Sequence, residues 1–149
     1  MKRFLALFLA ALMLFSCVFV FAACDNDDKD DKDTEKKGTV PNSDPEKAKA
    51  ALEEAGYIVQ YSKTNAGGIK ATIKAIKIDE DGKKLGFINI VYCEDKDAAN
   101  VAWERDKSAL EDAKTEMGEI YNCDENEIVL KKSGTIIYMG TNDAVEAAK

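Results

Sequence analysis

A β-hairpin is encoded in residues 71–94, which read ATIKAIKIDEDGKKLGFINIVYCE. Two runs rich in β-branched and aromatic residues flank the polar turn Glu80–Lys83, and such residues favour pleated strands over helices. Gly82 can adopt the positive φ that tight hairpin turns require. The segment therefore predicts two antiparallel strands, Ala71–Asp79 and Leu85–Glu94.

The first of these strands carries apolar side chains of both parities. Ile73 is odd in number, whereas Ile76 and Ile78 are even. A strand with one buried face keeps a single parity, and one extra residue in the strand restores the alternation. The change of parity predicts a β-bulge near Ala75.

The elements expected on either side of the hairpin complete an α+β domain. They are a helix from Pro45 to Ala55 capped by Ser43 or Asp44, a strand over 57–61, a flexible loop over 62–68, a long helix from Asp95 or Asp97 to about Met117, a hairpin of strands over 127–131 and 135–139, and a short helix ending at Ala148. The order is α-β-β-β-α-β-β-α. We expect a two-layer sandwich, with a mainly antiparallel five-stranded sheet and its helices on one face.

The N-terminus has the features of an export signal. Lys2 and Arg3 precede Phe4–Ala23, an apolar run that is interrupted only by Ser16 and Cys17. A positive start, an apolar stretch and a small-residue exit are typical of secretory signal peptides. Since the positive residues stay on the inner side, the rest of the chain is expected outside.

The residues Phe21-Ala22-Ala23-Cys24 resemble the lipobox of bacterial lipoproteins, although that family usually has an aliphatic residue where Phe21 stands. The resemblance implies that Cys24 takes a diacylglyceryl thioether and becomes the first mature residue. It implies attachment to the outer face of the cell membrane, in a bacterium of the Gram-positive type. Two alternatives remain open: a second lipobox that ends at Cys17, and an uncleaved membrane-spanning helix. The resemblance covers about the first 25 residues and indicates location, not activity.

Three segments follow from this reading: a signal peptide at 1–23, the lipidated Cys24 with an acidic tether at 24–42, and one domain at 43–149. Within the tether, Asp25–Lys37 contains no apolar residue, so it cannot offset the entropy of ordering. A tether of this length keeps the domain within a few tens of Å of the membrane.

Charge and composition exclude several function classes. The net charge is −7, which disfavours binding to the phosphate backbone of nucleic acids. The chain has no histidine, and therefore lacks the usual general base near neutral pH and the commonest transition-metal ligand. We predict no cofactor and no metal site.

Cys93 and Cys123 form an even pair once the signal is removed and Cys24 is lipidated. Two alternatives stay open for them. A disulfide would close a loop of about 31 residues and stabilise the domain by roughly 3 to 4 kcal/mol. Otherwise both are small buried hydrophobic side chains.

No set of residues matches a known catalytic constellation. We therefore expect a non-catalytic binding or interaction module, whose partner is an envelope protein or a small ligand. The alternative is an envelope hydrolase or transferase that uses carboxylates or a Ser-Lys pair. The aromatic residues are expected mainly in the core, with ligand platforms as the other reading. They are Tyr57, Tyr61, Tyr92, Trp103, Tyr121 and Tyr138.

Overall fold

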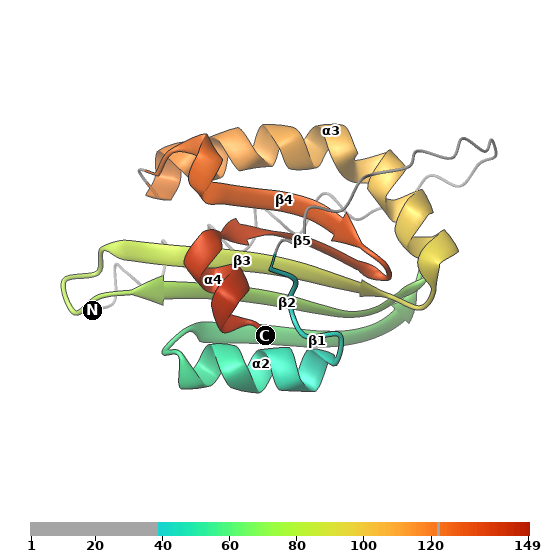
Figure 1. Ribbon diagram of the computed structural model, residues 1–149, viewed down its shortest axis with the longest axis horizontal. Coiled ribbons are helices and arrows are strands. Elements are labelled where there is room, and N and C mark those ends of the chain that lie inside the picture. Colours follow the sequence, from blue (N-terminus) through green and yellow to red (C-terminus); the bar gives the residue numbers. More distant parts are fainter. Residues whose placement is uncertain (1–38, 122) are drawn as a thin grey trace. The chain divides into compact units, whose positions relative to one another are not determined.

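The computed structural model describes residues 39–121 and 123–149 (Figure 1). Its elements are α2 (Pro45–Glu54), β1 (Ile58–Ala66), β2 (Ile69–Ile78), β3 (Lys84–Cys93), α3 (Lys96–Tyr121), the 3₁₀ turn η2 (Glu125–Glu127), β4 (Ile128–Ser133), β5 (Ile136–Thr141) and α4 (Asn142–Ala147). This confirms the order α-β-β-β-α-β-β-α. The expected signal peptide, Cys24 and most of the tether lie outside the described residues and stay predictions.

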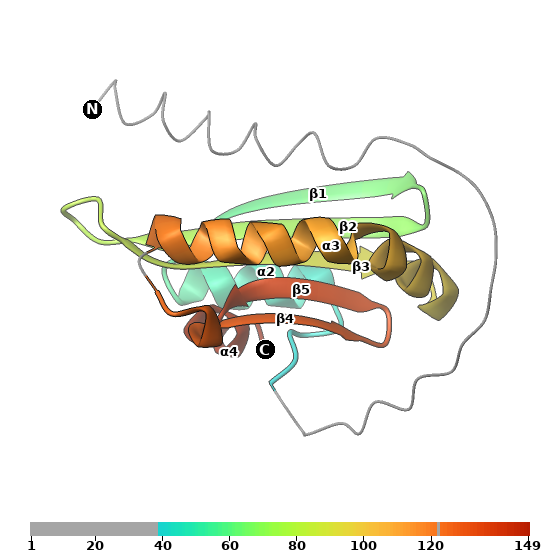
Figure 2. The same ribbon diagram turned by 90° about the horizontal axis from the view of Figure 1, so that it is seen from above.

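The five strands form one antiparallel sheet in the order β1-β2-β3-β5-β4. β3 lies at its centre, because α3 connects β3 to β4 and the hairpin that follows returns β5 to the free side of β3. Figure 2 shows β1 and β4 at opposite margins of the sheet. The predicted antiparallel five-stranded sheet is confirmed.

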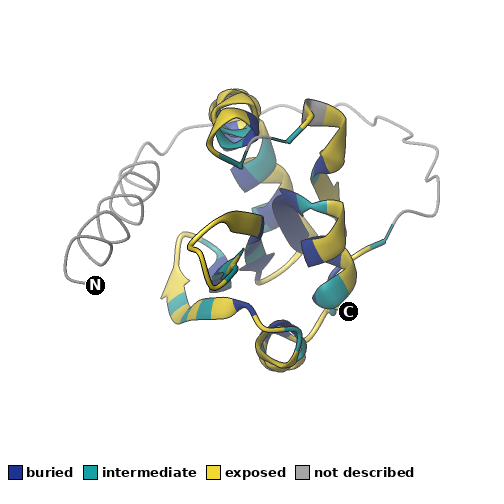
Figure 3. Cartoon of the chain, turned by 90° about the vertical axis from the view of Figure 1, so that its left-hand side faces the viewer, coloured by how far each residue is buried: buried dark blue, intermediate teal, exposed yellow. Residues whose placement is uncertain are grey.

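The expectation that all helices lie on one face is wrong. One face of the sheet packs against α2 and α4, with Ile73, Ile90 and Tyr138 among its buried strand residues. The other face packs against α3, through a smaller cluster that includes Cys93 and Ile137. Buried residues, dark blue in Figure 3, lie between these helices and the strands. The sheet is therefore the middle of three layers.

The predicted bulge near Ala75 is absent. β2 pairs with β3 in continuous register from Ala71 to Lys77, and the register shifts lie at the two ends of the strand. Ile73 faces α2 and α4, so Ile76 and Ile78 face the opposite side of the sheet. The change of parity reflects a strand with apolar residues on both faces.

The predicted loop over 62–68 is wrong as well. β1 continues to Ala66, and a two-residue turn joins it to β2. Gly67 and Gly68 adopt φ of 63° and 73°, the left-handed conformation that favours glycine in such turns. A Cβ on Gly68 would lie 2.7 Å from the Cβ of Ala98, so α3 starts in close contact with this turn.

Helix capping explains where the two longer helices begin. Asp44 caps α2, since its side chain accepts a hydrogen bond from the Glu46 N–H, and Pro45 occupies the first turn. Asp95 accepts from the Ala98 N–H at the start of α3. In the described part of the chain, no helix combines the length and the apolar character needed to cross a bilayer.

Candidate functional site

The segment Thr39–Asn42, expected to belong to the tether, is attached to the domain. The Tyr138 hydroxyl donates to the Thr39 carbonyl at 3.0 Å, and the Tyr92 hydroxyl donates to the Asn42 carbonyl at 3.0 Å. The Asn42 N–H donates to the Ala148 carbonyl at 2.7 Å. The domain predicted at 43–149 therefore leaves out Thr39–Asn42, which contact it. We call this segment the junction.

Both tyrosines of the junction are core residues with a polar end. Their exposed fractions are 2% each, and burial raises the pKa of both hydroxyls, so they remain neutral donors at physiological pH. A buried tyrosine hydroxyl needs a partner, and here main-chain carbonyls of the junction supply it. The sequence identified these rings as core residues but gave no signal for their acceptors.

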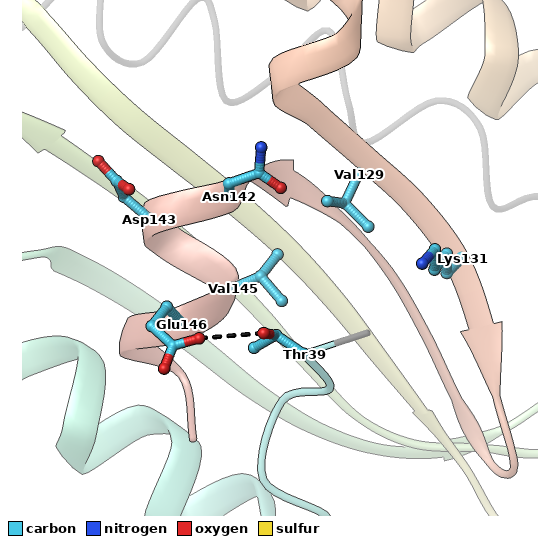
Figure 4. Close-up of a pocket in the computed structure, with 7 residues that line it drawn as sticks. All are labelled: Thr39, Val129, Lys131, Asn142, Asp143, Val145 and Glu146. Carbon is cyan, nitrogen blue, oxygen red and sulfur yellow. Dashed lines mark hydrogen bonds between the residues drawn. The ribbon is translucent and has the colours of Figure 1, made fainter. Parts of the chain in front are cut away.

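A shallow hollow of about 310 Å³ lies beside the junction (Figure 4). It is lined by Thr39, Val129, Lys131, Asn142, Asp143, Val145 and Glu146. The Thr39 hydroxyl donates to Glu146 at 3.0 Å, and hydrogen bonds from Lys149 and Thr39 lower the pKa of the Glu146 carboxyl. The charged side chains of the lining are exposed to solvent. This arrangement lacks the dry, converging groups that acid–base catalysis uses.

The two cysteines are free thiols at opposite ends of α3. Cys93 ends β3 just before the helix, and Cys123 follows its last turn. A helix of 26 residues is about 39 Å long, far beyond the reach of a disulfide. The disulfide alternative is therefore wrong for this fold. Cys93 is 3% exposed among alanines of α3, as the buried-hydrophobe alternative expects, whereas Cys123 is only partly buried. Burial raises the pKa of both thiols.

One buried carboxylate is present in the described part of the chain. Asp106 of α3 is 7% exposed, and the guanidinium of its neighbour Arg105 donates to both its oxygens at 2.7 Å. A bidentate pair satisfies the buried charge and leaves no acid or base available for catalysis. We assign the pair a structural role.

The other polar groups considered for catalysis do not converge. Asp79 closes the β2–β3 turn, where its side chain accepts from the main-chain N–H groups of Asp81 and Lys83 at 3.1 and 2.7 Å. The candidate serines of a Ser-Lys pair, Ser62, Ser108 and Ser133, lie on β1, α3 and β4. No group of three or more potential metal ligands occurs within 39–121 and 123–149.

An apolar surface remains where α3 leaves the sheet uncovered. α3 packs on β3, β5 and β4, and among the elements of residues 39–121 and 123–149 no helix packs extensively on the same face of β1 and β2. Ile58 of β1 pairs directly with Ile76, which pairs with Phe87 of β3. Phe87 in turn contacts the Tyr121 ring of α3, with 4.7 Å between ring centroids. This row of side chains runs from the sheet margin to the end of α3.

We define the isoleucine patch as Ile58, Ile76, Ile78 and Ile120. Three of them are strongly exposed: Ile58 at 51%, Ile78 at 41% and Ile120 at 43%. Ile120 belongs to the last turn of α3 and precedes Tyr121, whose ring contacts Phe87. The sequence signal for the patch was the parity change in β2.

The strands carry mainly basic residues and the helices mainly acidic ones. The five strands carry seven lysines and no acidic residue. The three α-helices carry twelve acidic and six basic residues. Four of the strand lysines lie on β1 and β2, so these two strands are basic in an acidic protein.

Comparisons of the chain with protein-family models, curated proteins and solved structures find no match.

Proposed function

We propose that the chain is a bacterial lipoprotein, anchored through Cys24 on the outer face of the cell membrane, whose α+β domain binds a partner close to the bilayer. The observation that carries the binding role is the isoleucine patch on the uncovered sheet face. Contiguous exposed apolar side chains on a soluble domain mark interaction sites, because their burial is favourable only when a partner covers them.

The remainder of the domain supports a binding role over a catalytic one. Its carboxylates cap turns, pair with arginine or stand in solvent around an open hollow. Its thiols have raised pKa values, which leaves them protonated and weakly nucleophilic. The anchor contributes by confinement, since a short tether raises the effective concentration of the domain for partners in the same layer.

The anchor is tested with the variants Cys24→Ala and Cys17→Ala. Intact mass of the detergent-extracted protein should give a mature chain that begins at Cys24 with added acyl mass, and Cys24→Ala should lose the acyl mass and its membrane attachment. Cys17→Ala is the matched control and should behave as wild type. Loss of attachment in Cys17→Ala alone would move the anchor to the second lipobox.

The binding role is tested by crosslinking in intact cells followed by affinity recovery. The wild-type chain should enrich a small set of envelope proteins, and Ile58→Ser should reduce that enrichment. The matched control is Val101→Ser, which removes a β-branched side chain that is 67% exposed on α3 and lies outside the patch. If both variants recover the same proteins as wild type, the patch does not carry the binding. Small ligands that raise the melting temperature, with no protein recovered, would replace partner binding with ligand capture.

A further inference from the structure

We propose that β1 binds an extended, acidic segment of the partner protein as a sixth strand of the sheet. This inference rests on the proposed function and names the chemistry of the partner. Strand addition at a sheet margin combines main-chain hydrogen bonds with side-chain contacts at alternate positions. The backbone, the apolar side chains and the charge of this margin each support it.

The outer edge of β1 offers unpaired main-chain groups. β1 pairs with β2 on one side, and within 39–121 and 123–149 no hydrogen bond is made by its main chain on the other side. The register is regular from Ile58 to Lys63, a run of six residues. Such a run spans about 20 Å and matches the length of a short peptide strand.

β1 is a better template than β4, the other margin of the sheet. β4 has six residues and β1 has nine. α3 lies over one face of β4, where Ile128 approaches Gly118. On the opposite face, Lys131 of β4 and Thr39 of the junction line the same hollow. At β1, the described part of the chain covers only the face toward α2.

Side chains on both faces of β1 would contact an added strand. On the uncovered face Ile58 is half-exposed and continues into the isoleucine patch. On the opposite face Val59 and Tyr61 are partly buried against the core. Apolar side chains at alternate positions of the incoming segment would pack beside Ile58.

The charge of this margin selects an acidic segment. Lys63, Lys70, Lys74 and Lys77 lie on β1 and β2, and neither strand has an acidic residue. Lys63 pairs with Glu46 at 2.7 Å, but both side chains are more than half exposed, so an incoming carboxylate can compete for the ammonium group. Complementary charge orients a segment and speeds its association.

The test measures peptide binding to the full chain in nanodiscs of zwitterionic phospholipid. The probe is a fluorescent peptide of about eight residues in which glutamate alternates with isoleucine or valine, matching the regular part of β1. Fluorescence anisotropy should show saturable binding. The same peptide with alternate backbone nitrogens methylated should bind about tenfold or more weakly, because it cannot complete the strand pairing. A peptide with lysine in place of glutamate should also bind about tenfold or more weakly.

The protein variants locate the binding site. Ile58→Ser should weaken the acidic peptide about fivefold or more by removing a side chain of β1 that is exposed in the free protein. Val101→Ser should leave the affinity unchanged. Equal affinity for the methylated and unmethylated peptides, or equal losses in the two variants, would overturn the proposal.

Two further outcomes separate this proposal from its alternatives. If the peptides do not bind while crosslinking still recovers a partner through the patch, strand addition fails and the proposed function stands. Nanodiscs that contain anionic phospholipid provide the second comparison. If the patch lies against that bilayer, Ile58→Cys will be protected from a water-soluble maleimide and no peptide will bind. That result would identify a lipid surface, and not an acidic peptide, as the ligand of the patch.

Discussion

Removing the hydroxyl groups that hold the junction should destabilise the domain by a measurable amount. Tyr138→Phe and Tyr92→Phe each delete one hydrogen bond to a main-chain carbonyl, at Thr39 and Asn42. A typical hydrogen bond contributes about 1 kcal/mol, and a buried acceptor that is left without a partner costs about 1 to 3 kcal/mol. Each variant should therefore lose about 1 to 2 kcal/mol in the free energy of unfolding, measured by urea denaturation.

Deleting residues 39–42 gives an independent value for the same contacts. The deletion removes both tyrosine hydrogen bonds, the one from Asn42 to Ala148 and the exposed one from Thr39 to Glu146, so a loss of about 3 kcal/mol or more is expected. Tyr57→Phe is the matched control, because the Tyr57 hydroxyl makes none of the hydrogen bonds to the junction, and its change should stay below about 0.5 kcal/mol. Wild-type stability in the deletion variant would refute the conclusion that the junction belongs to the domain.

Three further changes test other parts of the structure. Gly140→Ala should lower the free energy of unfolding by about 3 kcal/mol, because the added Cβ would lie 2.6 Å from a main-chain carbonyl oxygen of β3. Gly134 has a φ of 60° and open space around it, so Gly134→Ala should lower it by about 1 kcal/mol in the same denaturation assay. Burial raises the pKa of Tyr121 to about 12. The folded state thus favours the neutral phenol. The stability that Tyr121 contributes in this way is fully present below about pH 10 and should be lost as the pH rises through about 12. Thermal unfolding measured across that pH range would show the loss. Arg105→Ala should cost about 2 kcal/mol by leaving the Asp106 carboxylate buried without its partner, and the double variant that adds Asp106→Asn should recover part of that loss.

Local sequence signals predicted the elements and their order. The cap at Asp44 followed by Pro45, the polar turn before β3 and the glycine at position 134 each fix a boundary through the conformation of a few neighbouring residues. These signals act over short distances along the chain, so they can be read without knowing the fold. The predicted loop over 62–68 failed because β1 is polar beyond Tyr61, and pairing with β2 holds it extended.

The distribution of side chains between two faces could not be read in this way. Ile76 and Ile78 break the alternation set by Ile73. A strand with a bulge and a regular strand with apolar residues on both faces give the same sequence pattern. The choice depends on where α3 lies, which is a contact between residues far apart in the chain. The isoleucine patch therefore became visible only when α3 was found over β3, β5 and β4.

The sequence by itself determined the element order, the antiparallel hairpins and the expectation of a lipid anchor at Cys24, because each depends on a contiguous run of residues. Tertiary structure decided the placement of helices on both faces, the attachment of the junction and the separation of Cys93 from Cys123 by the length of α3. The physical reason is that packing joins segments through surface complementarity. The free energy of the whole domain decides which apolar face packs against which helix or strand. One face can be buried only where another element is free to cover it.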